Sequence, residues 1–284
     1  MRKYINILKE KKFKKEKITM LTAYDYITAK IIDESSIDII LVGDSYGMVK
    51  LGYETTLPVT LEEMLVVSKA VSRGIENSIL VVDMPFLSCN GTVSESIHNC
   101  GRVLKETKAQ GVKIESSFNN IELIKKIVEA DIPVMGHIGL TPQSIYKLGG
   151  YKIQGKTAED ARKILDLAYA LEAAGVFAVV LEGITEETAK VITEKLSIPT
   201  IGIGAGKYCD GQVLVIDDIL GMNKDFVPKH TKVYANLYGI IKKAVDSYKK
   251  DVEQNKFPKN INSTKMDENE FKKFLIDVEL GDEK

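Results

Sequence analysis

Residues 38–47 of the chain read Asp38-Ile-Ile-Leu-Val-Gly-Asp44-Ser45-Tyr46-Gly47. Residues 39–43 carry no charge and are mostly β-branched or leucine, which is typical of a strand buried on both faces of a parallel sheet. The strand ends in Gly-Asp-Ser, so a carboxylate follows directly after a buried segment. An ionised carboxylate beside an apolar core is costly unless it is paired or binds a metal. The stretch therefore predicts a buried strand with a charged site at its carboxyl end.

The same pattern recurs further along the chain. Three more segments of largely apolar residues each close on an acid, which is Asp83, Glu115 or Glu182. Parallel strands present their carboxyl ends at the same edge of a sheet, so the four carboxylates would surround one opening. We call this opening at the carboxyl ends of the strands the mouth.

Strand-like and helix-like segments alternate over most of the chain. The strands are predicted at residues 18–23, 39–43, 79–83, 112–115, 133–139, 179–182, 199–204 and 213–216. Helical patterns lie between them, at about 26–36, 60–73, 92–110, 120–130, 157–174 and 186–196, and a last long helix is predicted at about 232–254. Eight strands in this alternation favour a (β/α)₈ TIM barrel over a doubly wound sheet.

Local signals mark several helix ends. Asp25 is a predicted N-cap, and Thr60 with Glu63 three residues later predicts a capping box. Gly111 suits the C-terminal end of the helix before it. A tight turn that allows close backbone approach is predicted at Gly202-Ile-Gly-Ala-Gly206.

We predict one catalytic domain over residues 1–258, with a short polar N-terminal leader, followed by a polar tail over 259–284. The tail has one weak amphipathic patch, formed by Phe271, Phe274, Leu275 and Val278. We expect it to be partly disordered or docked on a neighbour.

Composition excludes several classes of protein. The 284 residues have a formal net charge of -1, so nothing indicates binding to nucleic acid or an anionic membrane. Three widely spaced cysteines form neither a zinc pattern nor a disulfide framework. The N-terminus lacks the apolar segment of a secretory signal, and no run of about 18 apolar residues could span a membrane. We expect a cytoplasmic protein.

The acids at the strand ends are candidate metal ligands. Asp44, Asp83 and Glu115 follow neighbouring strands, and converging oxygen ligands suit Mg²⁺, which retains waters and takes only one or two carboxylates. The alternative is that each acid caps the next helix or pairs with a lysine.

Three further residues point toward the same mouth. Lys113 lies two residues before Glu115 and faces inward with it, either to neutralise that acid or to hold an anionic substrate. Glu182 stands apart on a later strand and is a candidate general base, with a salt bridge as the alternative. His137 either contacts substrate or is a satisfied core histidine. Ser45 can hydrogen-bond a bound acid, but it lacks the relay of a catalytic nucleophile.

With these residues assembled, the chain resembles the ketopantoate hydroxymethyltransferase family. One matching motif is Gly136-His-Ile-Gly-Leu-Thr-Pro-Gln-Ser144, and the co-linear matches extend over roughly residues 17–258. The others lie at residues 19–25, 41–45, 56–60, 83–86, 112–115, 149–155 and 202–206 with 210–215.

The resemblance implies a barrel of the phosphoenolpyruvate mutase and isocitrate lyase type. It implies Mg²⁺ held through Asp44 and Asp83, with Glu115 as a direct or water-mediated ligand, and Glu182 as the catalytic base. The substrate 3-methyl-2-oxobutanoate is expected to contact Ser45, Asp83 and Lys113. It also implies 5,10-methylenetetrahydrofolate as co-substrate, a homodecamer, and a place in pantothenate biosynthesis.

The chain departs from the family pattern in places. Ser116-Ser117 replaces a frequent Gly-Gly pair, and His230 replaces an aromatic residue. These departures affect the segments expected to cover the site and not the expected metal ligands. Two rival functions have less support from the sequence. A lyase on the same barrel is disfavoured because the Lys-Lys-Cys-Gly-His loop of isocitrate lyases is absent. A non-catalytic scaffold is disfavoured by the intact acids.

Overall fold

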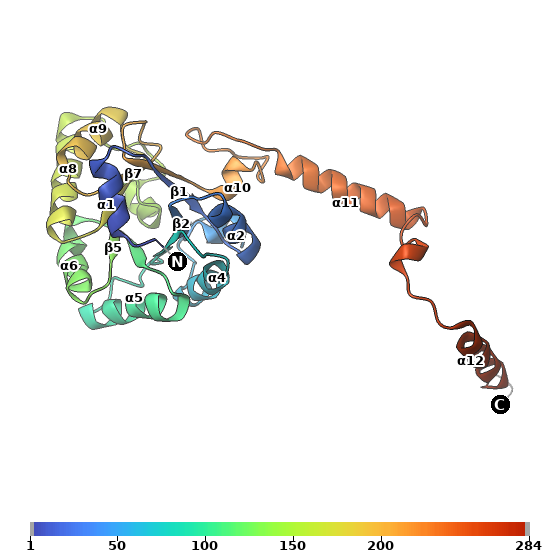
Figure 1. Cartoon of the computed structure of the whole chain (residues 1–284). Coiled ribbons are helices and arrows are strands. Elements are labelled where there is room, and N and C mark those ends of the chain that lie inside the picture. The colour runs from blue at the N-terminus through green and yellow to red at the C-terminus, as the bar shows by residue number, and fades with distance from the viewer. Residues whose placement is uncertain (1–2, 282–284) are drawn as a thin grey trace. The chain divides into compact units, whose positions relative to one another are not determined.

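A computed structural model describes the backbone of residues 3–281 (Figure 1). Eight parallel strands form a closed barrel in sequence order, each pairing with the next and the last with the first. This confirms the predicted (β/α)₈ barrel. The strands are β1 (Ile18–Thr22), β2 (Ile39–Val42), β3 (Ile79–Asp83), β4 (Gly111–Glu115), β5 (Val134–Gly139), β6 (Ala178–Glu182), β7 (Thr200–Ile203) and β8 (Gly211–Leu214).

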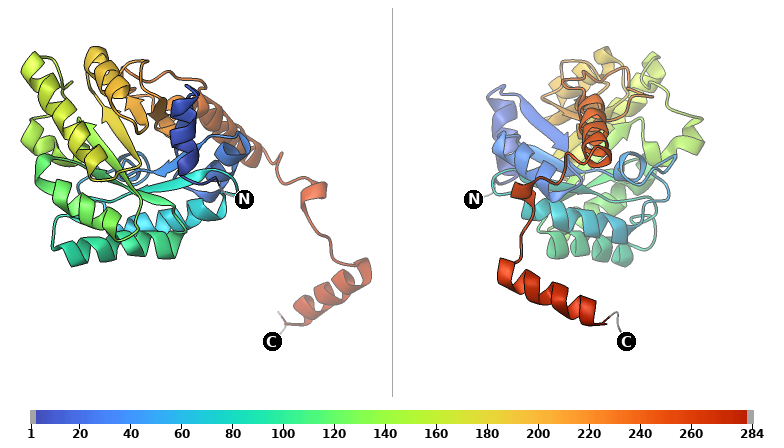
Figure 2. Two further views of the ribbon diagram at one scale, coloured as in Figure 1. Left: turned by 60° about the vertical axis from the view of Figure 1, so that its left-hand side comes forward. Right: turned by 90° about the vertical axis from the view of Figure 1, so that its right-hand side faces the viewer.

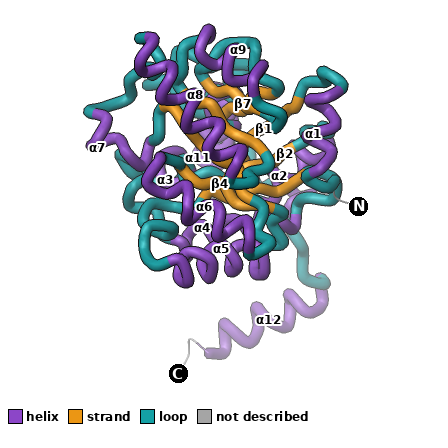
Figure 3. The backbone as a smooth tube through the Cα atoms, turned by 90° about the vertical axis from the view of Figure 1, so that its left-hand side faces the viewer, coloured by secondary structure: helices purple, strands orange, loops and turns teal. Residues whose placement is uncertain are grey.

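Helices surround the strands in every view (Figures 2 and 3). The longer ones of the barrel are α2 (Tyr26–Glu34), α4 (Leu61–Arg73), α5 (Val93–Thr107), α6 (Ile121–Glu129), α8 (Ala158–Ala173) and α9 (Glu186–Lys195). Short helices are α1 (Asn6–Phe13), α3 (Tyr46–Val49), α7 (Ile145–Leu148) and α10 (Ile216–Ile219), with 3₁₀ turns η1 (Phe118–Asn120) and η2 (Pro142–Ser144). Within the described residues, no helix combines the length and the apolar character needed to cross a membrane.

The barrel has two apolar layers because successive side chains of a strand point to opposite faces. In β2, Ile39 and Leu41 point inward and pack with the inner residues of the other strands. Ile40 and Val42 belong to the larger outer core, where the strands pack against the surrounding helices. This alternation decides which side chains at the strand ends face the barrel axis.

The segment predicted as a polar leader forms helix α1, which packs at the amino end of the barrel. Leu8 is 1% exposed and packs with the inner layer of the strands. Lys3 pairs with the buried Asp38 at 3.0 Å, and Lys12 pairs with Asp210 at 2.7 Å. The basic residues that made this segment look solvated therefore hold α1 against the barrel.

The predicted caps at Asp25 and Thr60 are confirmed, because their side chains accept hydrogen bonds from the backbone N–H groups of Thr28 and Glu63. The prediction for Gly111 is wrong. Helix α5 ends at Thr107, with Lys108 in the left-handed conformation at φ 59°, and Gly111 begins β4 instead. A Cβ at Gly111 would lie 3.1 Å from the Pro133 carbonyl, so close strand packing explains this glycine.

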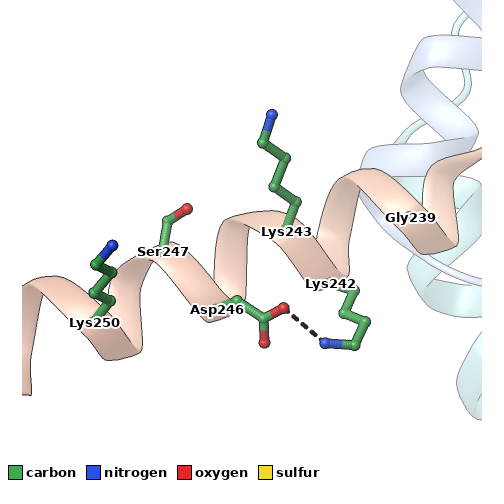
Figure 4. Close-up of a pocket in the computed structure, with 6 residues that line it drawn as sticks. All are labelled: Gly239, Lys242, Lys243, Asp246, Ser247 and Lys250. Atoms are coloured by element: carbon green, nitrogen blue, oxygen red, sulfur yellow. Dashed lines mark hydrogen bonds and ion pairs between the residues drawn. The ribbon is translucent and has the colours of Figure 1, made fainter.

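The chain divides into two compact units, Met1–Tyr234 and Ala235–Lys284. The division falls before the predicted boundary at 258, because α11 (Leu237–Glu253) belongs to the second unit. No residue of α11 is buried. One face of this helix has a shallow pocket where Lys242 pairs with Asp246 at 2.6 Å (Figure 4). The tail contains η3 (Asn260–Asn262) and α12 (Glu268–Gly281).

Candidate active site

Five predicted site residues continue the inner rows of the barrel at its carboxyl end. Asp83 follows Ile79 and Val81 on the inner face of β3, and the same two-residue spacing turns the others inward. Asp83 is in register with Lys113, and Glu115 is in register with His137. Glu182 is the last residue of β6, the strand that pairs with β5. Neighbouring strand ends therefore place these charged side chains around one mouth.

The end of β2 adds Asp44 and Ser45 to this mouth. The backbone N–H of Asp44 donates to Asp83 Oδ2 at 3.1 Å. Gly43 leaves room for the Ser45 hydroxyl, because a Cβ at Gly43 would lie 2.9 Å from Ser45 Oγ. Ser45 Oγ lies 2.7 Å from the hydroxyl of Tyr24, a buried residue that follows β1 and that the sequence did not single out.

Lys113 brings a positive charge to the mouth, where it forms an ion pair with Asp83. Its Nζ lies 2.7 Å from Asp83 Oδ1, and the two side chains are 9% and 5% exposed. Burial disfavours the ammonium, but Asp83 and Asp44 outweigh this, so the pKa of Lys113 is raised. The lysine stays charged, and its ion-pair partner is Asp83 rather than the predicted Glu115.

Among residues 3–281, no lysine or arginine lies as close to Asp44 or Glu115 as Lys113 lies to Asp83. Burial, and then the charge of Asp83, raises the pKa of Asp44 to about 7. Burial, and then the charge of Asp44, raises the pKa of Glu115 to about 9. A bound divalent cation would favour the ionised forms of both groups, since an opposite charge nearby stabilises a carboxylate.

His137 lies between the lysine and the candidate base. It is 1% exposed, with Nδ1 at 3.4 Å from Lys113 Nζ and Nε2 at 3.2 Å from Glu182 Oε2. Burial and the charge of Lys113 lower the pKa of His137, so the imidazole is neutral at neutral pH. The Glu182 side chain is 21% exposed, which leaves it more open than the acids deeper in the mouth.

Gln143 is a residue that sequence reasoning missed. It lies in η2, after β5, and its amide Nε2 donates to Asp44 Oδ2 at 2.8 Å and to the Met84 carbonyl at 3.0 Å. Its backbone N–H donates to both carboxylate oxygens of Glu115, at 3.2 and 3.1 Å. The only available signal was its place in the Gly136–Ser144 motif, which said nothing about its contacts.

Two further side chains border the mouth. Burial, and then the charges of Glu182, Asp44 and Glu115, raises the pKa of Tyr151, whose hydroxyl lies 4.0 Å from the sulfur of Met48. His230, one of the departures from the family pattern, packs near Gly204, where a Cβ would lie 3.2 Å from its Nδ1.

The oxygen donors of the site suit a hydrated metal ion better than a fully protein-bound one. Over residues 3–281, no three acidic, histidine or cysteine side chains are grouped as a ready-made metal site. Asp44 and Asp83 nevertheless fit a cation that keeps most of its waters, since both are buried oxygen donors at adjoining strand ends. Glu115 is held to one side by the backbone of Gln143.

Solved structures share this fold. Phosphoenolpyruvate phosphomutase from Streptomyces platensis subsp. rosaceus superposes with a TM-score of 0.59 at 15% identity, covering 89% of this chain and 88% of that one. The structure of 2,3-dimethylmalate lyase gives a TM-score of 0.57 at 14% identity, over 98% of this chain and 97% of that one. It is described as a member of the PEP mutase/isocitrate lyase superfamily. These likenesses show that the chain shares the (β/α)₈ barrel fold of those proteins.

Sequence similarity identifies the family. The family model described as ketopantoate hydroxymethyltransferase matches residues 2–260. A 3-methyl-2-oxobutanoate hydroxymethyltransferase of Clostridium beijerinckii is 51% identical over 96% of this chain and 99% of its own length. One of Thermosipho melanesiensis is 56% identical over 86% of this chain and 92% of its own length. The chain belongs to the ketopantoate hydroxymethyltransferase family and is an enzyme of that family.

The raised pKa of Asp44 predicts a dependence of stability on pH. A carboxyl group with a higher pKa in the folded than in the unfolded state makes stability fall as pH rises from about 4, its unfolded value. With Asp44 this loss is complete above its folded pKa of about 7. In EDTA at pH 8, Asp44→Asn should therefore raise the free energy of unfolding by roughly 1–4 kcal/mol.

Urea unfolding at pH 5 and pH 8 measures this effect. The gain should shrink at the lower pH, because the wild-type carboxyl group is then largely protonated when folded. The exposed Asp225 serves as control, and Asp225→Asn should leave the free energy of unfolding unchanged at both pH values. A lower stability of Asp44→Asn at pH 8 would contradict the prediction.

Proposed function

We propose that this chain transfers a hydroxymethyl group to 3-methyl-2-oxobutanoate and forms 2-dehydropantoate. The one-carbon unit would come from 5,10-methylenetetrahydrofolate, with water supplying the hydroxyl oxygen and tetrahydrofolate leaving. The observation that carries this proposal is one mouth with four acids and a buried lysine, in a chain that belongs to this enzyme family.

We propose Mg²⁺ as the metal, held by Asp44 and Asp83, with Glu115 as a direct or water-mediated third ligand. Support comes from the excess of carboxylates over cations and from the raised pKa values of Asp44 and Glu115. When bound, Mg²⁺ would polarise the keto group of the substrate and so increase the acidity of its C3 hydrogen.

The chain's own residues would orient the 2-oxo acid and stabilise the developing charge. Lys113 supplies an ammonium that its buried ion pair with Asp83 holds in place. A fixed cation in a site shielded from water stabilises an enolate oxygen better than a mobile one, because it needs no reorganisation during the reaction. The Ser45 hydroxyl, oriented by Tyr24, would donate to the substrate carboxylate.

Glu182 would remove the proton from C3. Its side chain is the more exposed acid of the mouth, so a substrate can reach it. His137 Nε2 lies 3.2 Å from Glu182 Oε2, and because the imidazole is neutral it places no full positive charge there, which would weaken the carboxylate as a base. The enolate carbon then attacks the one-carbon unit.

An assay with purified protein tests the reaction. Turnover of 3-methyl-2-oxobutanoate should require both 5,10-methylenetetrahydrofolate and a divalent cation, stop in EDTA and return when Mg²⁺ is restored. Activity that persists at the same rate in EDTA, after the metal has been shown to be removed, would reject the metal. Absence of product with every divalent cation supplied would reject the reaction.

Exchange of the C3 hydrogen tests the role of Glu182. In deuterated water without folate, NMR should show wild-type exchange of this hydrogen and a loss of about 10²–10⁴-fold in Glu182→Gln. Binding of the 2-oxo acid should change little, because the oxygen contacts use other residues. Glu187→Gln on α9 is the control and should exchange normally. Wild-type exchange in Glu182→Gln would assign the base elsewhere.

We also propose a homodecamer. Support comes from α11, whose apolar side chains are exposed within a single chain, among them Ile240, Ile241, Val245 and Tyr248. Such a surface calls for a partner in the assembled protein. Light scattering at micromolar concentration should give a mass ten times that of the chain, whereas a monomer would reject any oligomer.

A further inference from the structure

Gln143 joins the ends of three strands through four hydrogen bonds. Its amide contacts Asp44, which follows β2, and the Met84 carbonyl, which follows β3. Its backbone N–H contacts Glu115, which ends β4. The turn η2 that carries it comes after β5, and 99 residues of chain separate Gln143 from Asp44.

The network determines how the amide is oriented. The Met84 backbone carbonyl can only accept, so the amide nitrogen and not the amide oxygen must face it, and the same nitrogen lies 2.8 Å from Asp44 Oδ2. Gln143 therefore gives one hydrogen to Asp44 Oδ2 and leaves Oδ1 of the same carboxylate for another partner.

The two candidate ligands are held by donors of different charge. Asp83 receives the ammonium of Lys113 at 2.7 Å, which neutralises much of its charge. Asp44 receives a neutral amide, which fixes the carboxylate but leaves its negative charge available. A lysine or arginine in place of Gln143 would compete with a divalent cation, whereas a neutral donor does not.

We propose that Gln143 is a positioning residue that holds the Asp44 carboxylate in the orientation needed to bind a divalent cation. This inference rests on the proposed metal site. Gln143 acts by orienting Asp44, and we propose no direct contact between Gln143 and the reacting atoms. Its backbone contact with Glu115 places the third acid independently of the side chain.

The substitution Gln143→Met tests the proposal, because methionine has a similar length and no N–H donor. Calorimetric titration of the substrate-free protein with Mg²⁺ should show an affinity about 10–100-fold weaker than that of wild type, the usual effect of losing a partner that orients a ligand. The backbone hydrogen bond to Glu115 remains, so the change reports on Asp44.

Gln154→Met is the matched control. Gln154 lies in the same β5–α8 connection, and its amide donates to the Lys152 carbonyl at 2.8 Å rather than to an acid. Its Mg²⁺ affinity should equal that of wild type. Thermal unfolding of all three proteins shows that each is folded at the titration temperature. If Gln143→Met does not fold, Gln143→Ala takes its place, with the same direction of change expected.

The outcomes are distinct. Weaker binding in Gln143→Met alone supports the proposal. Equal Mg²⁺ affinity in both variants, with a lower melting temperature for Gln143→Met, would show that Gln143 only secures the loop and would overturn it. Absence of Mg²⁺ binding to wild-type protein would reject the proposed metal, and with it this role. Retained wild-type binding with unchanged Gln143→Met affinity rejects the positioning role alone.

Discussion

The buried ion pair between Lys113 and Asp83 is the interaction on which the site depends. Both side chains are almost inaccessible to water, and neither charge could remain there without the other. Asp83 also accepts the backbone N–H of Asp44, so the pair connects the ends of β2, β3 and β4. Loss of Lys113 would leave Asp83 as a buried charge without its ion-pair partner, within a group of acids.

This pair leaves the mouth with an excess of negative charge. Asp44 and Glu115 have raised pKa values because burial and mutual repulsion both disfavour their ionised forms. The site therefore stores unfavourable electrostatic energy that a divalent cation would relieve. The carboxylates that weaken the fold at high pH are therefore the groups that we propose as metal ligands.

The two ends of the barrel use the same principle for different purposes. At the amino end, Asp38 and Asp210 are paired with lysines of the N-terminal segment, and Leu8 fills the interior, so charge and packing serve stability. At the carboxyl end, the inward-facing positions of the strands end in acidic side chains that outnumber the cationic ones. This separation is general for (β/α)₈ barrels, whose catalytic groups lie on the loops after the strands.

The sequence alone determined the barrel and most of the candidate site, because both follow from local patterns. Continuous apolar segments indicate buried strands. The two-residue repeat of a strand predicts that Lys113 faces inward together with Glu115. The tertiary structure decided which groups meet. Gln143 reaches Asp44 across 99 residues, and Lys113 pairs with Asp83 rather than with Glu115. Helix α1 looked like a solvated leader because its lysines have their acidic partners on distant strands. Such contacts depend on the path of the loops and on strand register, which no local pattern records.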